Sequence, residues 1–449
     1  MTETMTDAIM AAALARLSGQ VRSGQQTMAR AVAATLPDGG RLLVQAGTGT
    51  GKSLAYLAPA AAHLIANRSS RVVVATATLA LQTQLATKDV PLVLSAVADV
   101  SSTKLRWSLL KGRANYVCLL KLRDGVAAEP ALFGEDEVAA GLRATGADAQ
   151  SVLGAEVVAL RSWADGQLND QETGDRDDAP RHSAEAWYQL SVSNRECLGA
   201  RRCPRFTDCF VERARDQARH SDLNITNHAL LAVDAEADQA VIPDHDVVII
   251  DEAHDLPARV TSAATVELSP QAVERIIQRV TPWLSDPTVD SLVAASEAFQ
   301  VALEATSPGR LTDPASPLIQ ACRQIETATR AGLSGLKGQA SSQDNDRQQA
   351  AQTLDGIHEI AQRTAALDDS DVVWLSQRPA FGPQLVAAPL SVARIIRDTI
   401  LTPRSAILTS ATLALGGTFT GCAVSLGLSP ANDVSPPGES GGAETEKRS

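Results

Sequence analysis

Residues 41–53 read Arg-Leu-Leu-Val-Gln-Ala-Gly-Thr-Gly-Thr-Gly-Lys-Ser, an apolar segment followed by a glycine-rich loop that ends in Gly-Lys-Ser. Apart from an alanine in place of the first glycine, the loop from Ala46 to Ser53 has the spacing of a phosphate-binding loop. Its glycines leave backbone N–H groups free to surround phosphate oxygens and permit positive φ angles. The stretch predicts a strand, a loop that binds a nucleoside triphosphate, and a helix from Gly51 whose positive end faces the phosphates.

The positions of the loop have different predicted roles. Lys52 is expected to place its charge on the β- and γ-phosphates, and Ser53 to offer its hydroxyl to Mg²⁺. The other residues predicted to bind the nucleotide are Ala46, Gly47, Thr48, Gly49, Thr50 and Gly51. The alternative is an ordinary glycine turn before a helix. The Gly-Lys-Ser sequence disfavours this alternative, because it ends a loop that directly follows an apolar strand.

A second acidic motif, Asp251-Glu252-Ala253-His254, follows the apolar run at residues 247–250. Ligands of open α/β sheets bind at the carboxyl ends of the strands. Asp251 is therefore expected to hold Mg²⁺ through water, and Glu252 to orient or deprotonate the attacking water. A solvated acidic turn is the alternative, but the phosphate-binding loop earlier in the chain favours a complete nucleotide site.

Apolar strand-like runs recur along the chain, at residues 41–45, 71–75, 223–226, 247–250, 372–375 and 406–409. The early runs alternate with helical segments, which is typical of a parallel sheet with crossover helices. A cysteine-bearing stretch begins near residue 102, and residues 268–369 have a mostly helical pattern. The predicted fold class is therefore α/β, with one phosphate-binding-loop domain that is interrupted first by a cysteine-bearing insert and then by a helical insert.

Composition limits the classes of partner. The chain has 449 residues, 44% of them hydrophobic, and a formal net charge of -12, so a nucleic acid would need local basic patches. Residues 1–17 contain acids but no basic leader segment, and no apolar run has the length of a membrane helix. The prediction is a cytoplasmic protein without a membrane partner, whose cysteines do not form disulfides.

Four cysteines are candidates for one metal centre: Cys118, Cys197, Cys203 and Cys209. Thiolates suit iron–sulfur clusters and zinc alike. Structural zinc usually has more closely spaced cysteine pairs, so the five-residue gaps favour a cluster and leave zinc or no metal as alternatives. Cys322 and Cys422 are predicted to be buried, inert thiols.

Basic residues gather in the same part of the chain. Residues 104–123 contain six basic side chains and no acid: Lys104, Arg106, Lys111, Arg113, Lys121 and Arg123. Such residues contact phosphates, and Tyr116 and Phe206 could stack on bases, so we expect DNA at residues 104–123. Residues 195–219 are rich in arginine but also in acids, so a DNA contact and a solvated face are equally compatible with them.

The combined motifs point to a family. The loop at 46–53, the Asp-Glu-Ala-His box and Thr409-Ser410-Ala411-Thr412 resemble motifs I, II and III of superfamily 2 helicases. With the four cysteines and the segments 110–118 and 226–231, residues 15–425 resemble the DinG/XPD-type iron–sulfur DNA helicases, and DinG most closely. In that family the segment equivalent to Arg22-Ser23-Gly24-Gln25 holds an adenine-contacting glutamine, which would be Gln25.

The resemblance implies an ATP-dependent DNA helicase that moves 5′→3′ on single-stranded or forked DNA in DNA repair. Its cofactors would be ATP, Mg²⁺ and a [4Fe–4S] cluster on the four cysteines. Residues 76–78 would touch the DNA backbone, and His254 with residues 410–412 would couple hydrolysis to DNA movement. The implied RecA-like domain comprises 1–103, 222–265 and 371–428; the iron–sulfur insert is 104–221, a helical arch-like insert is 266–370, and a disordered tail is 429–449.

The family also has a second RecA-like domain, which would begin soon after Thr412. The resemblance fades near Leu428, and the family's final arginine motif has no counterpart in this sequence. We therefore expect a truncated helicase, with a separately encoded C-terminal RecA-like domain as a candidate partner. The alternatives are an ATP- and DNA-binding module that does not unwind DNA, and a phosphate-binding-loop ATPase of another class with a zinc insert.

Overall fold

A computed structural model describes the chain except for residues 1, 21, 48, 125–146, 171, 195, 201, 237–239, 338–344, 379–381, 415, 429–443 and 449. The described residues form two compact units. The first unit comprises residues 1–111, 214–264 and 391–449, and the second comprises residues 112–213 and 265–390. The chain therefore leaves the first unit twice and returns to it twice, as the two predicted inserts require.

The first unit is built on a sheet in which the described strands have the order β11-β1-β10-β5-β2-β4-β3. The strands are β1 (Arg41–Gln45), β2 (Val72–Thr76), β3 (Trp107–Leu109), β4 (Leu223–Asn227), β5 (Val247–Asp251), β10 (Ser405–Ser410) and β11 (Glu444–Arg448). All neighbouring pairs are parallel except β1 with β11. The predicted α/β class with a parallel sheet is confirmed.

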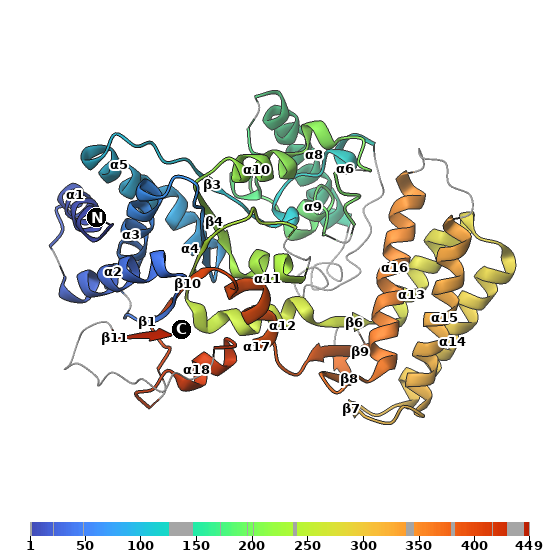
Figure 1. Ribbon diagram of the computed structural model, residues 1–449. Helices are drawn as coiled ribbons and strands as arrows, with labels where there is room; N and C mark the ends of the chain where they lie inside the picture. Colours follow the sequence, from blue (N-terminus) through green and yellow to red (C-terminus); the bar gives the residue numbers. More distant parts are fainter. Residues whose placement is uncertain are drawn as a thin grey trace. The chain divides into compact units, whose positions relative to one another are not determined.

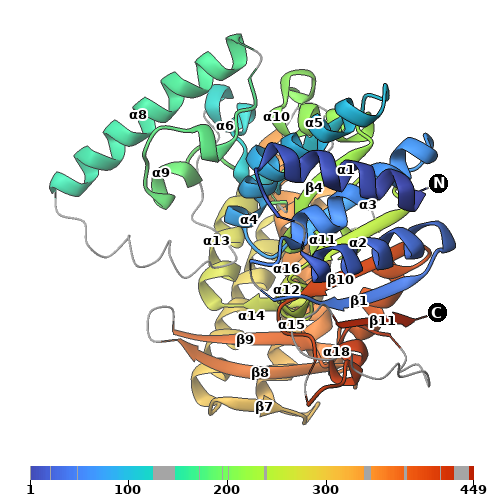
Figure 2. The same cartoon turned by 90° about the vertical axis from the view of Figure 1, so that its left-hand side faces the viewer.

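Helices cover both faces of this sheet (Figure 1, Figure 2). One face packs against α1 (Thr2–Arg16), α2 (Ser23–Thr35), α3 (Lys52–Ala66) and α5 (Val90–Val100); the other packs against α11 (His228–Glu236), α12 (Leu256–Ala264) and α18 (Thr420–Ser425). Alternate residues of each strand face opposite ways, so in β1 Leu42 and Val44 join the first core and Leu43 joins the second. Burial on both faces explains why the strands are continuous apolar runs.

The end of the chain differs from the prediction. Composition predicts disorder over residues 429–449, but residues 444–448 form β11, which pairs antiparallel with β1. The physical reason is that β1 is the outermost parallel strand, and its edge N–H and C=O groups accept another strand whatever its side chains are. The remainder of that prediction, residues 429–443, lies outside the described residues.

The first part of the second unit carries one long helix, α8 (Ala147–Asn169), together with the short helices α6 (Leu119–Asp124) and α9 (Ala184–Tyr188) and the start of α10 (Phe210–Arg219). Trp187 donates from Nε1 to the Ala114 carbonyl at 2.7 Å, which joins α9 to the beginning of the insert. Gly174, with φ of 63°, lies directly on the Phe210 ring, where a Cβ would overlap the ring. This part begins at 112 rather than the predicted 104, because β3 joins the main sheet.

The second part contains four long helices, which lie side by side in Figure 1. They are α13 (Pro270–Val280), α14 (Asp286–Ala305), α15 (Pro317–Lys337) and α16 (Asn345–Ala366). Leu354, Ile357 and Ala361 are fully buried, as their helical spacing predicts. Cys322 is also buried, as predicted, and burial raises the pKa of its thiol to about 12. Cys422, in the first unit, is only half-buried.

An antiparallel sheet completes this part, with the order β6-β9-β8-β7. Its strands are β6 (Val266–Leu268), β7 (Gly309–Leu311), β8 (Asp371–Arg378) and β9 (Gly382–Pro389). The prediction assigned residues from 371 onward to the phosphate-binding-loop domain, but residues up to 390 belong to the second unit. A β-branched run shows that a strand forms but not which sheet it joins, and β8 pairs with β9 and β7 instead.

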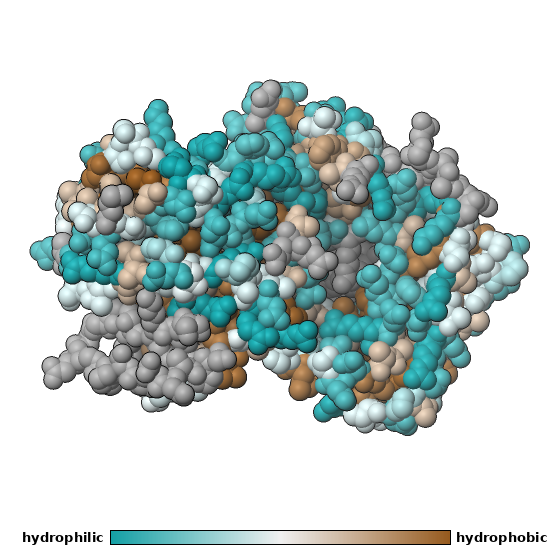
Figure 3. All heavy atoms as spheres, in the orientation of Figure 1, coloured by the Kyte–Doolittle hydropathy of each residue, from teal (hydrophilic) through white to brown (hydrophobic). Residues whose placement is uncertain are grey.

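The face of the molecule in Figure 3 is mostly hydrophilic, with hydrophobic residues in small groups. Among the described helices, none combines the length and the apolar character that a membrane crossing requires.

The free energy of unfolding should fall as the pH is lowered from about 6.5 towards 4. Burial, helped by the charge of Arg404, lowers the pKa of His245 to about 4, and burial also lowers the pKa values of His63 and His228. The unfolded chain takes up these protons near pH 6.5 while the folded chain does not, so acid favours unfolding.

Denaturant titrations across this pH range provide the measurement. His245 bonds through Nδ1 to the Pro243 carbonyl, at 2.9 Å, so Nδ1 carries the proton and the side-chain amide of His245→Asn offers that carbonyl a donor. This variant should show a smaller pH dependence than the parent chain. The same dependence in both proteins would contradict the assignment.

Candidate functional site

The phosphate-binding loop has the predicted form. It follows β1, and α3 begins at Lys52 directly after it. Gly49 and Gly51 have φ angles of 77° and 82°, in the region that favours glycine. A Cβ on Gly51 would also overlap the side-chain amide of Gln25. The backbone conformation thus requires glycine at positions 49 and 51. Thr48 lies outside the described residues.

Side chains from the start of α2 hold this loop from one side. Gln25 is buried and donates from Nε2 to the Gly51 carbonyl at 3.0 Å. Arg22 donates from its guanidinium to the Gly49 carbonyl. Within the loop, Thr50 Oγ1 donates to the Gly47 carbonyl at 2.8 Å. The contact of Gln25 with adenine stays a prediction, and its contact with the loop is a role that the sequence did not reveal.

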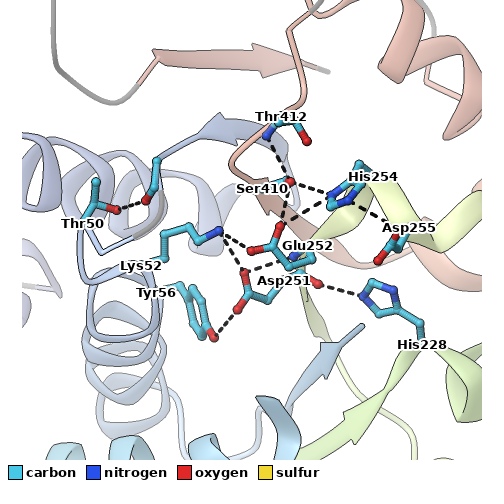
Figure 4. Close-up of polar contacts among 11 residues, drawn as sticks. Thr50, Lys52, Tyr56, His228, Asp251, Glu252, His254, Asp255, Ser410 and Thr412 are labelled. Carbon is cyan, nitrogen blue, oxygen red and sulfur yellow. Dashed lines mark hydrogen bonds and ion pairs between the residues drawn. The ribbon is translucent and has the colours of Figure 1, made fainter. Parts of the chain in front are cut away.

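Lys52 meets the acidic motif at the centre of the site (Figure 4). Its Nζ lies 2.5 Å from Glu252 Oε1 and 4.0 Å from Asp251 Oδ1. Burial raises the pKa of Asp251, which the charge of Lys52 partly offsets. Burial also opposes ionisation of Glu252, but hydrogen bonds from Lys52 and Ser410 outweigh it and lower the pKa of that carboxyl. The structure thus brings together the three charged residues that the sequence assigned to one site.

Glu252 has an unusual backbone conformation. It follows the last residue of β5 and has φ of 55° and ψ of 46°, the left-handed region that non-glycine residues seldom adopt. Such conformations cost of the order of 1 kcal/mol or more and cluster at functional sites. Here the turn directs the Glu252 carboxylate towards Lys52 and Ser410.

Ser410 connects Glu252 with the rest of the acidic motif. Its hydroxyl donates to Glu252 Oε2 at 2.9 Å and lies 2.7 Å from His254 Nδ1. The Thr412 N–H donates to the same hydroxyl at 3.2 Å. Because a hydroxyl has one proton and here gives it to Glu252, His254 Nδ1 must be the donor in its bond with Ser410. The motif at 409–412 is therefore joined by hydrogen bonds to the motif at 251–254.

Three further residues shape the site, and sequence reasoning missed them. Tyr56 lies under Asp251, with its Oη 3.2 Å from Oδ2, and His228 donates from Nε2 to the Asp251 carbonyl at 2.8 Å. Gln45 Oε1 accepts from the Leu413 and Ala414 N–H groups, at 2.8 and 2.6 Å. Only Tyr56 had a usable signal, because it lies one helical turn after Lys52.

The four cysteines of the candidate metal centre are all half-buried in the second unit. Cys118 is close enough to Cys197 and Cys203 to interact electrostatically with them, and Cys209 interacts with Cys197. Burial raises the pKa of the Cys118 thiol to about 11 and also raises that of Cys209, against the effect of nearby backbone N–H groups. The structure therefore gathers cysteines that are far apart in the sequence.

Hydrogen-bond donors surround these sulfurs. The N–H groups of Leu120 and Lys121, at the start of α6, point to Cys118, and those of Val211 and Glu212, at the start of α10, point to Cys209. Cys197 Sγ accepts from the Arg113 guanidinium at 3.2 Å and from the Gly199 N–H at 3.4 Å. Within the described residues, no three or more His, Cys, Asp or Glu side chains are placed to hold a single metal ion.

The predicted DNA-contacting stretch is corrected in part. Lys111, Lys121 and Tyr116 are buried, with 3%, 5% and 3% of their surface exposed, so they cannot meet a nucleic acid in this conformation. Lys121 lies over the Tyr188 ring at 4.7 Å and 3.8 Å from a carboxylate oxygen of Glu196. Sequence shows the charge of a side chain but not its partner, which is why these lysines looked available.

Other members of the predicted DNA surface are accessible. Lys104 and Arg106 are exposed in the first unit, and Phe206 is 42% exposed in the second. Arg113 is mostly buried and pairs with Glu212 at 3.3 Å. In residues 76–78, Thr76 and Ala77 are buried and only Thr78 is exposed, where it caps α4 (Leu79–Gln84).

Comparison with known proteins identifies relatives. Residues 25–114 match the DEAD/DEAH box helicase family model. The ATP-dependent helicase DinG of Mycobacterium tuberculosis (strain H37Rv) is 39% identical over 440 residues, which cover 94% of this chain and 64% of that protein. The ATP-dependent DNA helicase YoaA of Escherichia coli (strain K12) is 35% identical over 242 residues, 53% of this chain and 33% of YoaA. The 3′-5′ exonuclease DinG of Bacillus subtilis is 27% identical over 91% of this chain and 47% of its own length.

Solved structures of an XPD helicase and of a truncated XPD align with a TM-score of 0.45 and 13% identity, covering 91% and 92% of this chain and 61% and 100% of theirs. The fold and the site define the class as a phosphate-binding-loop protein with a DEAH box. Within that class, the chain is similar to the DinG/XPD-type helicases of superfamily 2. It spans 64% of the length of its mycobacterial relatives.

Gly51→Ala should weaken nucleotide binding by about tenfold or more, because an L-residue is strained at φ of 82° and its Cβ would displace Gln25. Binding of a fluorescent ATP analogue to the purified chain measures this. Gly356→Ala, in a helix with open space around the added Cβ, is the matched control and should bind as the parent does. Equal binding by all three proteins would contradict the geometry of the loop.

Proposed function

We propose that the chain is the ATP-hydrolysing part of a DNA helicase of the DinG type. The observation that carries this proposal is the convergence of Lys52, Asp251 and Glu252 at one edge of the parallel sheet, with Lys52 Nζ 2.5 Å from Glu252. A lysine from a phosphate-binding loop beside a strand-end Asp-Glu pair is the arrangement that positions a triphosphate and a water for hydrolysis. The mycobacterial relatives are named ATP-dependent helicases.

In the proposed reaction, the backbone N–H groups of the loop and the N-terminus of α3 bind the triphosphate. Lys52 exchanges its Glu252 partner for the β- and γ-phosphate oxygens, which leaves Glu252 free to accept a proton from water. The water oxygen forms a bond to the γ-phosphorus as the bond from that phosphorus to the bridging oxygen of ADP breaks. Ser53 and Asp251 would hold Mg²⁺, which neutralises charge on the β- and γ-phosphates.

The link between hydrolysis and DNA movement would run through Ser410. This residue contacts Glu252 and His254 at once, at 2.9 and 2.7 Å, so a change in the protonation or position of Glu252 alters both bonds. We propose that the chain from Glu252 through Ser410 to His254 transmits the state of the nucleotide. The 5′→3′ direction of movement is part of the same proposal and rests on the resemblance to the family.

We further propose that the four cysteines hold a [4Fe–4S] cluster. Four half-buried thiols lie together, and backbone N–H groups point to three of them, which is the environment that stabilises thiolate ligands.

The substrate of the proposed helicase is DNA with a single-stranded or forked region, in a DNA-repair setting. In the first unit, the exposed Lys104 and Arg106 can contact phosphates. In the second unit, Phe206 is exposed next to the cysteine segment and can stack on a base.

Glu252→Gln should bind ATP but lose at least about 100-fold in hydrolysis rate, because a positioned general base contributes 10²–10⁴-fold. Steady-state ATPase assays with and without single-stranded DNA, together with equilibrium binding of a fluorescent ATP analogue, separate the two effects. Glu236→Gln, at an exposed position of α11, is the control and should hydrolyse normally. ATP hydrolysis that survives in Glu252→Gln would remove Glu252 from the mechanism, and a parent chain that DNA does not stimulate would contradict the proposed motor.

The chain purified without oxygen should be brown and contain iron and acid-labile sulfide. Cys197→Ser should lose most of the iron because one ligand of the set is removed. Cys322→Ser, in the helical insert and remote in sequence from the set, should keep it. Zinc in place of iron, or equal iron in both variants, would contradict the cluster assignment.

A further inference from the structure

Tyr56 lies fully buried beneath the nucleotide site, on the first turns of α3 (Figure 4). Its hydroxyl is 3.2 Å from Asp251 Oδ2 and is close enough to the Ser53 side chain to interact with it. Ser53 and Asp251 are the two residues that the proposed function assigns to Mg²⁺. One phenol oxygen is thus bonded to Asp251 and close to Ser53.

The two oxygens of Asp251 have different neighbours. Oδ1 accepts the Glu252 N–H at 3.1 Å and faces Lys52 Nζ at 4.0 Å, on the side where the phosphates would bind. Oδ2 contacts Tyr56. The hydrogen bond from Tyr56 therefore fixes the rotation of the carboxylate and keeps Oδ1 directed to the nucleotide.

A purely apolar role explains Tyr56 less well. Phenylalanine would fill the same space, whereas a fully buried hydroxyl must be paired, and here it pairs with Asp251, a residue of the proposed nucleotide site. The bond to a carboxylate is also charge-assisted and therefore among the stronger ones. Tyr56 makes no hydrogen bond to the backbone of the phosphate-binding loop in the described part of the chain.

We propose that Tyr56 is a positioning residue for the magnesium site, which it organises by holding the Asp251 carboxylate in place beside Ser53. The inference rests on the proposed nucleotide site and names a residue that determines the metal affinity of that site. Losing the outer partner of a metal ligand typically lowers metal affinity 10- to 100-fold. Binding of the nucleotide without metal depends on the loop and Lys52, so it should not need the Tyr56 hydroxyl.

The test uses Tyr56→Phe in the full chain, with a fluorescent ADP analogue as the probe. Titration with Mg²⁺ should give a half-saturating concentration at least about tenfold above that of the parent. Affinity for the analogue in EDTA should stay within about twofold. Tyr188→Phe removes a hydroxyl that bonds Glu196 at 3.1 Å in the second unit, and this control should leave the Mg²⁺ titration unchanged.

A double-mutant cycle shows whether Tyr56 acts through Asp251. In an Asp251→Asn background, Tyr56→Phe should have little further effect on Mg²⁺, because the ligand it positions is already lost. Full additivity of the two substitutions would overturn the inference, as would an unchanged Mg²⁺ titration in Tyr56→Phe.

Thermal unfolding of each variant shows whether the Tyr56 hydroxyl is needed for the fold and not for the magnesium site. A Tyr56→Phe protein that unfolds near room temperature, or that loses the analogue in EDTA as well, would assign the hydroxyl to the fold and also overturn the inference. Failure of the proposed function would look different, because the parent chain itself would then not bind the analogue with or without Mg²⁺.

Discussion

The ion pair between Lys52 and Glu252 is the interaction on which the site depends. A lysine with only a tenth of its side chain exposed needs an anionic partner, because an unpaired charge is costly to bury. That partner is Glu252, the group that the proposed mechanism needs for water. In that mechanism, a triphosphate must therefore compete with Glu252 for Lys52 before Glu252 can act on water.

The register of the sheet makes this contact possible. Strand β10 lies between β1 and β5, so Ser410 is level with Gln45 on one side and Thr409 with Asp251 on the other. Three motifs that are far apart in the sequence thus end at one edge. The two inserts leave this arrangement intact, because the chain departs after the outermost strand β3 and after α12, outside the row of central strands. Long excursions at such points add little closure entropy.

Local patterns in the sequence predicted the parts of the site that backbone chemistry dictates. Gly49 and Gly51 mark a loop with positive φ angles, and the apolar run before Asp251 marks a strand that ends at the binding edge. Pairing between distant segments could not be predicted in the same way. The sequences of β8, β9 and β11 do not indicate which strand each of them pairs with. The sequence around Lys121 likewise indicates an exposed cation, whereas in the structure Lys121 contacts Tyr188 and Glu196.

Ser410 shows how a small residue can determine the behaviour of the site. The Ser410 hydroxyl donates its single proton to Glu252, so it can only accept further hydrogen bonds. It accepts one from His254 Nδ1 and one from the Thr412 N–H. If Glu252 became protonated during hydrolysis, it would no longer require that proton, and Ser410 could donate to His254 instead. Gln45 holds the next two residues through their N–H groups, so the backbone after Ser410 stays anchored to β1. If the hydrogen bonds of Ser410 reversed in this way, His254 would change its tautomer and its orientation, while the strands of the sheet would stay in place.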